Sequence, residues 1–416
     1  MGGPGQATPR APGRMQRKAL SPSPFLRDPT RPRVWVTQGP DPYRNARAAL
    51  EHVDLSPARG RRVLLKPNAG RVAAPGSGVV TERRVVAAAI DAFQNIGAQV
   101  AVGDSPIAGV KRLEALEATG IAEVARARGC SVLDLDAGKA VEVPLPNGSA
   151  IQSLKVCPQI FAWDFIVSIP VMKIHMHTSV TLAVKNMKGC LWRRSKVDLH
   201  MLPPIDGTDE KSLDLAIADM SEILRPHLSL IDGTVGMEGM GPSAGRPKPL
   251  GVVVVGADAF ATDAVACRLM GQSAERIAHL RVGAQRGHGV IELARIETQP
   301  HDWPSHARDF ETAPENLSIE FPNVEVLDEN SCSACQSTLL LFLRRYGEQL
   351  FDYFPQGRPV TVAIGKGVSE VPAGALCVGN CTRQHRDRGV YVKGCPPVGS
   401  SIFRAISGDA SRDDGE

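Results

Sequence analysis

The 416-residue sequence has no long apolar run, and aromatic residues make up only 5% of it. No stretch reaches the roughly 18 consecutive apolar residues of a membrane-spanning helix, so we expect no membrane span. The net charge of +4 is small for this length. Nucleic-acid-binding domains are more basic and cluster their Lys and Arg residues. We therefore expect no nucleic acid as a partner, and an anionic small molecule is the simpler prediction.

A regular disulfide framework and a secretory signal are also missing. The nine cysteines are an odd number without even spacing, which argues against a secreted scaffold and favours a metal or cluster in a reducing compartment. Residues 1–33 contain no acid before Asp28 and no apolar signal core. We expect a cytoplasmic protein whose residues 1–33 are a disordered arm, or an upstream extension if Met15 is the true start.

The apolar pattern that is present predicts an α/β fold. Short apolar runs at 62–68, 98–102 and 131–135 alternate with amphipathic stretches at 82–96 and 111–128. This β-α-β-α-β order is typical of a doubly wound, mostly parallel sheet. We assign residues 34–290 to this domain, the proline-spotted segment 291–325 to a linker, and residues 326–416 to a smaller C-terminal α/β domain that carries cysteines.

Polar residues follow the predicted strands and form a basic group. Lys66, Asn68 and Asp104 stand at strand ends, where doubly wound sheets bind ligands in a crevice. Lys173, His175 and His177 alternate, so on an extended segment they share one face. A predicted helix over 179–192 adds three more polar residues, Lys185, Asn186 and Lys188.

This group predicts a seat for a carboxylate or phosphate. We assign proton transfer to His175, His177 and Lys185, since histidine beside such charge exchanges protons near neutral pH. Lys185 follows an apolar turn and needs a partner, either Asp104 or the ligand. The remaining members, assigned to substrate binding, are Lys66, Asn68, Asp104, Lys173, Asn186 and Lys188. Two alternatives stay open: a solvated basic surface, and a metal held by His175, His177 and His200.

Five cysteines gather in the last fifth of the chain. Cys332 and Cys335 are two residues apart, and Cys381 follows a Gly-Asn turn. Cys395 precedes two prolines, a sequence that can open the helix we predict over 398–406. Cys377 lies in an apolar strand and is the natural core residue, although it could replace Cys381 as a ligand. We therefore predict Cys332, Cys335, Cys381 and Cys395 as the metal ligands.

Three interpretations of these cysteines compete. Four thiolates are the ligand set of a [4Fe–4S] cluster. A structural zinc site is the alternative, although many Cys₄ zinc sites use two Cys-x-x-Cys pairs and this sequence has one. The third interpretation is that the cysteines only pack, which is the expectation for the scattered Cys130, Cys157, Cys190 and Cys267.

A glycine-rich stretch at 236–249 matches neither a P-loop nor a dinucleotide fingerprint. We expect a loop there, serving either as a mobile lid or as a backbone anion site. Asp232 and Asp263 lie nearby, and we expect both to cap backbone N–H groups rather than to act as bases.

Together these motifs resemble the DUF362 family. The matching segments are 65–68, 103–106, 169–175, 184–189, and 232–233 followed by 240–242, so the likeness covers about 60–290. The resemblance implies a family fold without a settled reaction, and many members are described as iron–sulfur proteins. The family's paired ferredoxin-type cysteine runs are missing here. The dispersed set ending in Gly-Cys-Pro-Pro looks instead like the cluster sites of respiratory-complex and hydrogenase small subunits.

Our first hypothesis is an iron–sulfur reductase. It would act on an anionic organic molecule in the Lys/His crevice, and a C-terminal [4Fe–4S] cluster would supply electrons or polarise the substrate. A redox protein would be the electron donor, and a homodimer is a candidate assembly. The alternatives are a non-enzymatic iron–sulfur electron carrier or assembly partner, and a non-redox metal-dependent isomerase or racemase.

Overall fold

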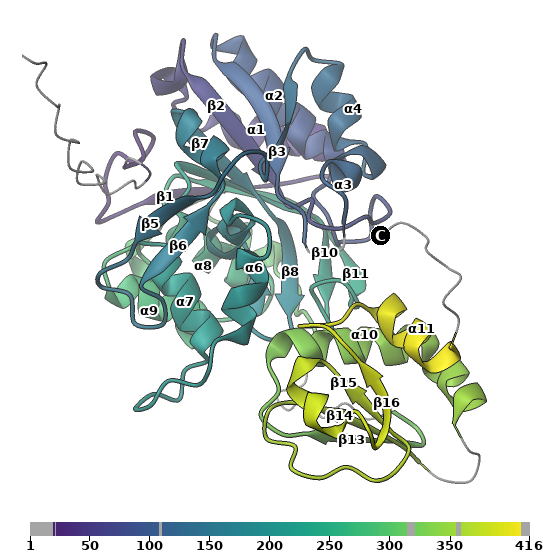
Figure 1. Cartoon of the computed structure of the whole chain (residues 1–416). Coiled ribbons are helices and arrows are strands. Elements are labelled where there is room, and N and C mark those ends of the chain that lie inside the picture. Colours follow the sequence, from purple (N-terminus) through teal and green to yellow (C-terminus); the bar gives the residue numbers. More distant parts are fainter. Residues whose placement is uncertain (1–19, 21, 108–109, 314–320, 355–358, 409–416) are drawn as a thin grey trace, which may run out of the picture.

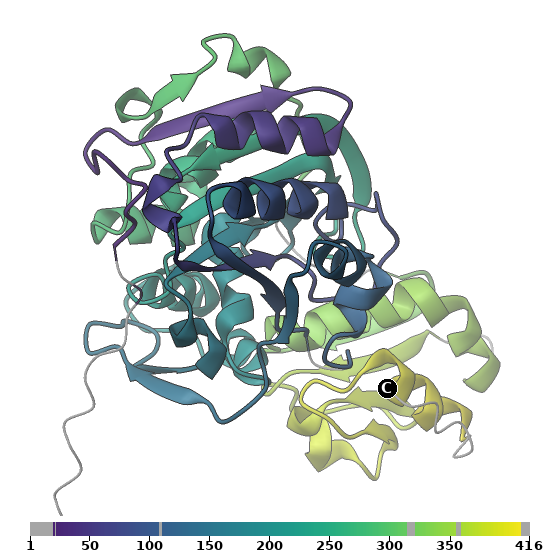
Figure 2. The same cartoon turned by 90° about the horizontal axis from the view of Figure 1, so that it is seen from above.

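The computed structural model describes residues 20, 22–107, 110–313, 321–354 and 359–408. Most of the predicted N-terminal arm lies outside this part. Two separate sheets with their helices make up the molecule, and the smaller one is built from the C-terminal residues (Figures 1 and 2).

The larger sheet is mostly parallel. Strand β11 runs antiparallel to its neighbours β1 and β10, whereas β10, β7, β2, β3 and β4 pair in parallel. Strand β8 (Val171–His175) extends the ladder of β10, and β9 (Ser179–Thr181) pairs antiparallel with β8. The order across the sheet is β12 (Glu297–Gln299), β1 (Arg33–Gln38), β11 (Arg246–Gly256), β10 (Leu228–Glu238), β7 (Phe165–Ile169), β2 (Arg62–Pro67), β3 (Gln99–Asp104) and β4 (Ser131–Asp134).

Helices cover both faces of this sheet because its strands are apolar on both sides. Along β2, Val63 and Leu65 pack into one core and Leu64 into the other. The first core contains α1 (Pro42–Glu51), α2 (Arg83–Asn95) and α4 (Ile121–Arg126). The second contains α5 (Ala183–Asn186), α7 (Ser212–Met220), α8 (Ala259–Leu269) and α9 (Ala278–Gln285). The predicted doubly wound, mostly parallel sheet is confirmed.

Short elements complete this region. Helix α3 (Glu114–Ala118) leads into α4, and α6 (Ser195–Asp198) follows the crevice residues. Strands β5 (Val141–Pro144) and β6 (Ser153–Val156) form a separate antiparallel pair. In the described part of the chain, no helix is long and apolar enough to cross a membrane.

Two local predictions are wrong, the second in part. The segment 179–192 is not one helix, because Ser179 takes φ +60° and Leu182 is extended, which leaves only the short α5 and a 3₁₀ turn at Met187–Cys190. The stretch 236–249 is a loop only at 239–245, between the end of β10 at Glu238 and the start of β11 at Arg246. It pairs along the ends of β10 and β11 as an antiparallel hairpin, with Glu238 opposite Arg246.

The C-terminal region is a small α/β unit of its own. Strands β13 (Val324–Asp328), β14 (Val360–Ile364), β15 (Ala375–Val378) and β16 (Gly389–Val392) pair in parallel in that order. Helices α10 (Ser333–Leu350) and α11 (Gly399–Ser407) pack on one face through an apolar core. Cys377 belongs to the small core on the other face, as its apolar strand indicates.

Two segments outside the predicted domain limits also take part in the folded structure. Phe25 packs into the core beneath α1 and α2, and the backbone N–H of Leu20 donates to the carbonyl of Ile223. Strand β12, inside the segment 291–325, pairs with β1 at the edge of the large sheet. Residues 314–320 of that segment lie outside the described part.

Candidate functional site

A cavity of about 610 Å³ lies between the two regions. One wall comes from the strand ends of the large sheet, with Lys66, Asp104 and His175. The other wall comes from α10 and from the segment between Cys395 and α11, which contributes Pro396 and Pro397. The basic crevice and the cysteine-bearing region therefore share one cavity, which the sequence could not establish.

The deepest polar contact is an ion pair between Lys66 and Asp104, whose nitrogen and oxygen lie 2.8 Å apart; both side chains are almost fully buried. Lys66 Nζ also donates to Asn186 Oδ1 (3.2 Å) and to the carbonyl of Pro67 (3.2 Å). All three ammonium protons thus have protein partners. A Cβ at Gly189 would lie 2.6 Å from Lys66 Nζ, so only glycine fits over this pair. The Lys66–Asp104 pair is therefore a fixed structural part of the site.

Asn186 and Lys173 belong to the same network of hydrogen bonds around Lys66. Asn186 accepts from Asn68 Nδ2 (3.2 Å) and donates to Ser168 Oγ (3.0 Å) and to the carbonyl of Lys66 (3.2 Å). Lys173 Nζ donates to Asn68 Oδ1 and to the carbonyl of Val79, both at 2.8 Å. These contacts fix the loop after β2 against β8. They leave little hydrogen-bonding capacity for a ligand at Lys66, Asn186 and Lys173.

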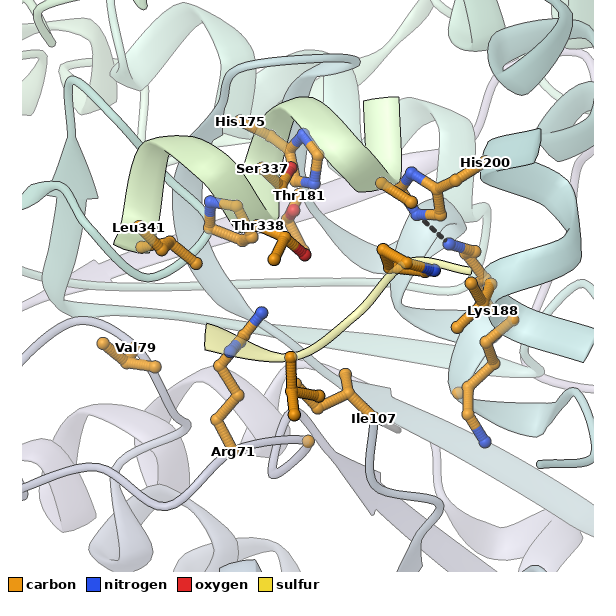
Figure 3. Close-up of a pocket in the computed structure, with 18 of the residues that line it drawn as sticks. Arg71, Val79, Ile107, His175, Thr181, Lys188, His200, Ser337, Thr338 and Leu341 are labelled. Carbon is orange, nitrogen blue, oxygen red and sulfur yellow. Dashed lines mark hydrogen bonds between the residues drawn. The ribbon is translucent and has the colours of Figure 1, made fainter. Parts of the chain in front are cut away.

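Lys185 and Lys188 make fewer hydrogen bonds to the protein than Lys66 and Lys173 do. Lys185 Nζ makes one hydrogen bond, to Thr181 Oγ1 at 3.3 Å, and the predicted partner Asp104 is taken by Lys66. Burial lowers the pKa of Lys185 to about 7, with only partial compensation from the charge of Asp214. Lys188 Nζ lies against His200 Nε2 (Figure 3). Burial and the charges of Lys185 and Lys196 hold the pKa of Lys188 well below its usual range.

The two predicted catalytic histidines have different positions. His175 lines the cavity, and its Nδ1 accepts a hydrogen bond from the backbone N–H of His177 (3.1 Å). The proton of neutral His175 therefore lies on Nε2. Burial and then the charge of Lys185 hold the pKa of His175 well below 6.5. Lys185, rather than His175, is thus the group that titrates near neutral pH. His177 Nε2 instead contacts Ser337 Oγ on α10 (2.8 Å), across the boundary between the two regions.

Three arginines that were not predicted from the sequence also line the cavity. Arg71 lies in the loop after β2, Arg194 precedes α6, and Arg345 lies on α10. Figure 3 shows the side chain of Arg71 extending into the cavity. Burial lowers the pKa of Arg71. The position of Arg71 three residues after Asn68, in the same strand-end loop, was the available signal. Arg194 and Arg345 became part of the site only through tertiary packing.

The four predicted cysteine ligands gather around the first turn of α10. Cys332 is the N-cap residue of this helix. A hydrogen bond from the Cys335 thiol and the backbone N–H groups of Cys335 and Ala334 lower the pKa of Cys332. The pKa of Cys335 is raised by its hydrogen bond with Cys332 and by burial, and the charges of Cys381 and Cys395 act in the same direction. All four sulfur atoms are thus within electrostatic reach of one another.

The backbone at Gly379 lets the segments that carry the cysteines come close together. This residue takes φ +96°, and a Cβ there would lie 3.4 Å from Cys335 Sγ and 3.7 Å from the carbonyl of Gly394. Glycine at this position lets the end of β15 meet α10 and the segment before Cys395. The helix predicted over 398–406 is confirmed as α11, which begins at Gly399, so neither proline after Cys395 is its first residue. The helix N-terminus next to the cysteines belongs to α10, where a negative group is favoured.

The donor set was tested against both predicted groups. A zinc ion would hold four sulfurs about 2.3 Å from one point. In residues that the structure describes, no three His, Cys, Asp or Glu side chains are arranged to hold one metal ion. A [4Fe–4S] cluster binds each thiolate through a different iron, so its ligands stand farther apart. Four gathered thiols, two of them joined by a hydrogen bond, supply the donor chemistry of either group.

The two aspartates act as caps. Asp263 on α8 accepts hydrogen bonds from the backbone N–H groups of Ala183 (2.7 Å) and Val184 (3.0 Å), at the start of α5. Asp232 accepts from Glu82 N (2.7 Å) and Thr234 N (3.0 Å). Burial raises the pKa of Asp263 to about 8 and that of Asp232 to about 6. Asp263 caps a neighbouring helix rather than its own, which the sequence could not reveal.

Two known proteins show similarity over part of the chain. The thylakoid-associated protein sll1697 of Synechocystis sp. (strain ATCC 27184 / PCC 6803 / Kazusa) is 30% identical over 206 residues, which is 50% of this chain and 62% of that protein. The lactate racemase apoprotein of Thermoanaerobacterium thermosaccharolyticum has a TM-score of 0.39 and 12% identity, over 65% of this chain and 61% of its own. The chain thus spans about three fifths of either protein. The TM-score is too low to support any argument from the racemase.

A family model described as "Domain of unknown function (DUF362)" matches residues 63–268. This range holds every crevice residue from Lys66 to His200, whereas the cysteine-bearing region and Arg345 lie beyond it. By this match, and by the crevice motifs that it contains, the chain belongs to the DUF362 family.

Proposed function

We propose that this protein is an iron–sulfur oxidoreductase that reduces a small organic anion. The anion would bind in the 610 Å³ cavity, and a [4Fe–4S] cluster would be held by Cys332, Cys335, Cys381 and Cys395. One observation carries the proposal. The cavity that contains Lys185 and Lys188 is also lined by Ala334, between two of the cysteines, and by Pro396, next to a third. A ligand there would lie between the basic crevice and the cluster.

The protein's own groups would bind and protonate the ligand. Lys188 and Arg71 would attract its negative charge, and the Nε2–H group of His175 would donate a hydrogen bond. Lys185 has a pKa of about 7 and only one weak hydrogen bond, so it can supply a proton at neutral pH. The C-terminal region covers the cavity and limits water, which strengthens these interactions.

The cluster, when bound, would supply single electrons. Reduction of one carbonyl or carbon–carbon double bond of the ligand takes up two electrons and two protons. The electrons would arrive one at a time from an acidic one-electron carrier protein. Exposed basic residues next to Cys381 support such a donor: Lys366 is close enough to lower the pKa of Cys381, and Arg383, Arg386 and Lys393 are exposed nearby.

The test compares cysteine variants after anaerobic reconstitution with iron and sulfide. We expect the wild-type protein to show broad visible absorption that bleaches on reduction, with about four irons per chain. Cys335→Ser should lose most of this absorption and iron. Cys377→Ser is the matched control because Cys377 lies in the core of the same sheet, and it should keep both.

Two results would overturn the proposal. One is a reconstituted wild-type protein that binds zinc and shows no visible absorption. The other is equal iron loss in Cys335→Ser and Cys377→Ser. A cluster that reduces reversibly in a protein that binds no small anion would favour the alternative of a non-enzymatic electron carrier.

A further inference from the structure

The cavity has a large excess of positive charge. Eight lysine and arginine side chains line it, with Asp104 as the one carboxylate among the lining residues. Lys66 is paired with Asp104, and Lys196 lies 3.6 Å from Asp136. The others form no ion pair with a carboxylate in the described part of the chain: Arg71, Lys173, Lys185, Lys188, Arg194 and Arg345. Charges of one sign at this density are costly to bury without a counter-ion.

These cations lie on separate sides of the cavity. Figure 3 shows Arg71 reaching in from one side, while Lys188 and His200 lie together on another. Apolar side chains complete the walls, among them Val79, Ile107 and Leu341. The cavity therefore holds two basic positions on different sides, and apolar side chains form other parts of its walls.

We infer that the ligand carries two anionic groups on an apolar body, with one group bound at Lys185 and Lys188 and the other at Arg71. This inference rests on the proposed function, because it names the class of small anion that the same cavity would take. Organic diacids and phosphorylated acids share this chemistry.

Arg71 is suited to the second anionic group. A guanidinium stays charged and presents paired N–H donors to a carboxylate or phosphate. In the described part of the chain, Arg71 has no hydrogen-bond acceptor or carboxylate partner, unlike Lys173, which donates twice to the protein. Its donors are therefore available within a half-buried site. The apolar side chains of the cavity wall, among them Val79, Ile107 and Leu341, would contact the ligand's carbon skeleton.

Binding should also be accompanied by proton uptake. Buried Lys185 and Lys188 have lowered pKa values, and a nearby anion would favour their charged forms. The titratable and charged groups that act on these two lysines and on the neighbouring His175 and Lys173 are Lys66, Arg71, Asp104, His177, Lys196, His200 and Asp214. Affinity for a dianion should accordingly decrease as the pH rises above about 7.

The test measures binding by titration calorimetry with the full chain. The probes are linear diacids of four, six and eight carbons, the monoacids of equal length, and their uncharged dimethyl esters. We expect the best diacid to bind at least about tenfold more tightly than its monoacid, as for a charge-assisted hydrogen bond at a partly buried site. Titrations in buffers of different ionisation enthalpy should show proton uptake at pH 8.

Arg71→Gln should weaken binding of the diacid about tenfold, to the affinity of its monoacid, and so abolish the preference for the diacid. Arg59→Gln, which changes an exposed arginine, is the matched control and should change neither. Equal affinity for diacid and monoacid, an equal loss of both in Arg71→Gln, or no binding of any probe would overturn the inference.

Cluster content is measured on the same preparations, which separates the two proposals. A protein that forms the cluster but does not prefer diacids contradicts this inference alone. A protein that prefers diacids but forms no cluster contradicts the proposed function alone.

Discussion

The lysines that line this cavity have different roles, which depend on the groups that each one contacts. Lys66 has an ion pair at 2.8 Å and two further hydrogen bonds, whereas Lys185 has a single bond of 3.3 Å to Thr181. A buried ammonium without a counter-ion destabilises the fold. Lys185 therefore costs the protein stability that Lys66 does not, which is typical of a residue kept for function.

This cost should appear in the pH dependence of stability. The pKa of Lys185 is about 7 in the folded protein and 10.5 ordinarily. Between these values the unfolded chain binds the extra proton, so stability rises with pH, and below about pH 7 the penalty is fully present. The rise due to this group is roughly 3–5 kcal/mol. Lys185→Met should therefore raise the free energy of unfolding at pH 7 and reduce its increase toward pH 10, as measured by urea denaturation.

The control for this variant is Lys139→Met, which removes an exposed lysine and should leave the pH dependence unchanged. A Lys185→Met protein less stable than wild type at pH 7, with the same slope against pH, would contradict the expectation.

At the scale of elements, α5 depends on a cap from outside itself. The helix spans four residues and is too short to be stable alone. Asp263 on α8 accepts its first backbone N–H groups, and α5 carries Lys185 and Asn186 into the cavity. The position of both side chains thus depends on a contact between segments about 80 residues apart.

We expect Asp263→Ala to destabilise the protein by about 2–4 kcal/mol, since two buried N–H groups lose their acceptor. Asp263→Asn should recover part of this loss because its amide oxygen can still accept one hydrogen bond. Chemical denaturation measures both. Asp209→Ala, an exposed change, should stay within about 0.5 kcal/mol of wild type. An Asp263→Ala loss as small as that of the control would show that the cap is not needed.

At the scale of the whole molecule, the cavity exists only because the C-terminal region packs on the large sheet. Hydrogen bonds join the two regions, among them His177 to Ser337, Arg194 to the carbonyl of Cys395, and Arg344 to the carbonyl of Ala244 (2.6 Å). Cys395 Sγ also lies 3.3 Å from Met201 Sδ. Both the positions of the proposed cluster ligands and one wall of the cavity depend on this packing.

The double variant Arg194→Ala, Arg344→Ala should loosen the packing without unfolding either region. Hydrogen exchange should increase in the first turns of α10, and the affinity for a bound diacid should fall roughly fivefold, as for solvent-accessible charged contacts. The cluster should be retained, because no proposed ligand is changed. The double variant Arg31→Ala, Arg59→Ala, which removes two exposed arginines, is the charge-matched control. Unchanged exchange in α10 would mean that these arginines do not hold the regions together.

The local predictions succeeded where neighbouring residues decide the structure. The parallel sheet follows from apolar runs such as 62–68 that alternate with amphipathic helices, and the burial of Cys377 follows from its own apolar strand. They failed where distant residues decide it. The segment 179–192 reads as a helix, but its start is set by Asp263, and the glycines at 236–245 fit a hairpin because β10 and β11 pair there.

The sequence by itself therefore determined the doubly wound sheet, the crevice motifs of the DUF362 family and the identity of the four cysteines that gather. These features depend on periodicity and spacing, which are local properties of the chain. The tertiary structure alone decided that Arg71, Arg194 and Arg345 join the site and that Lys66 is paired while Lys185 is not. It also decided that the cysteines adjoin the crevice, because burial, charge pairing and the packing of two sheets depend on residues far apart in the chain.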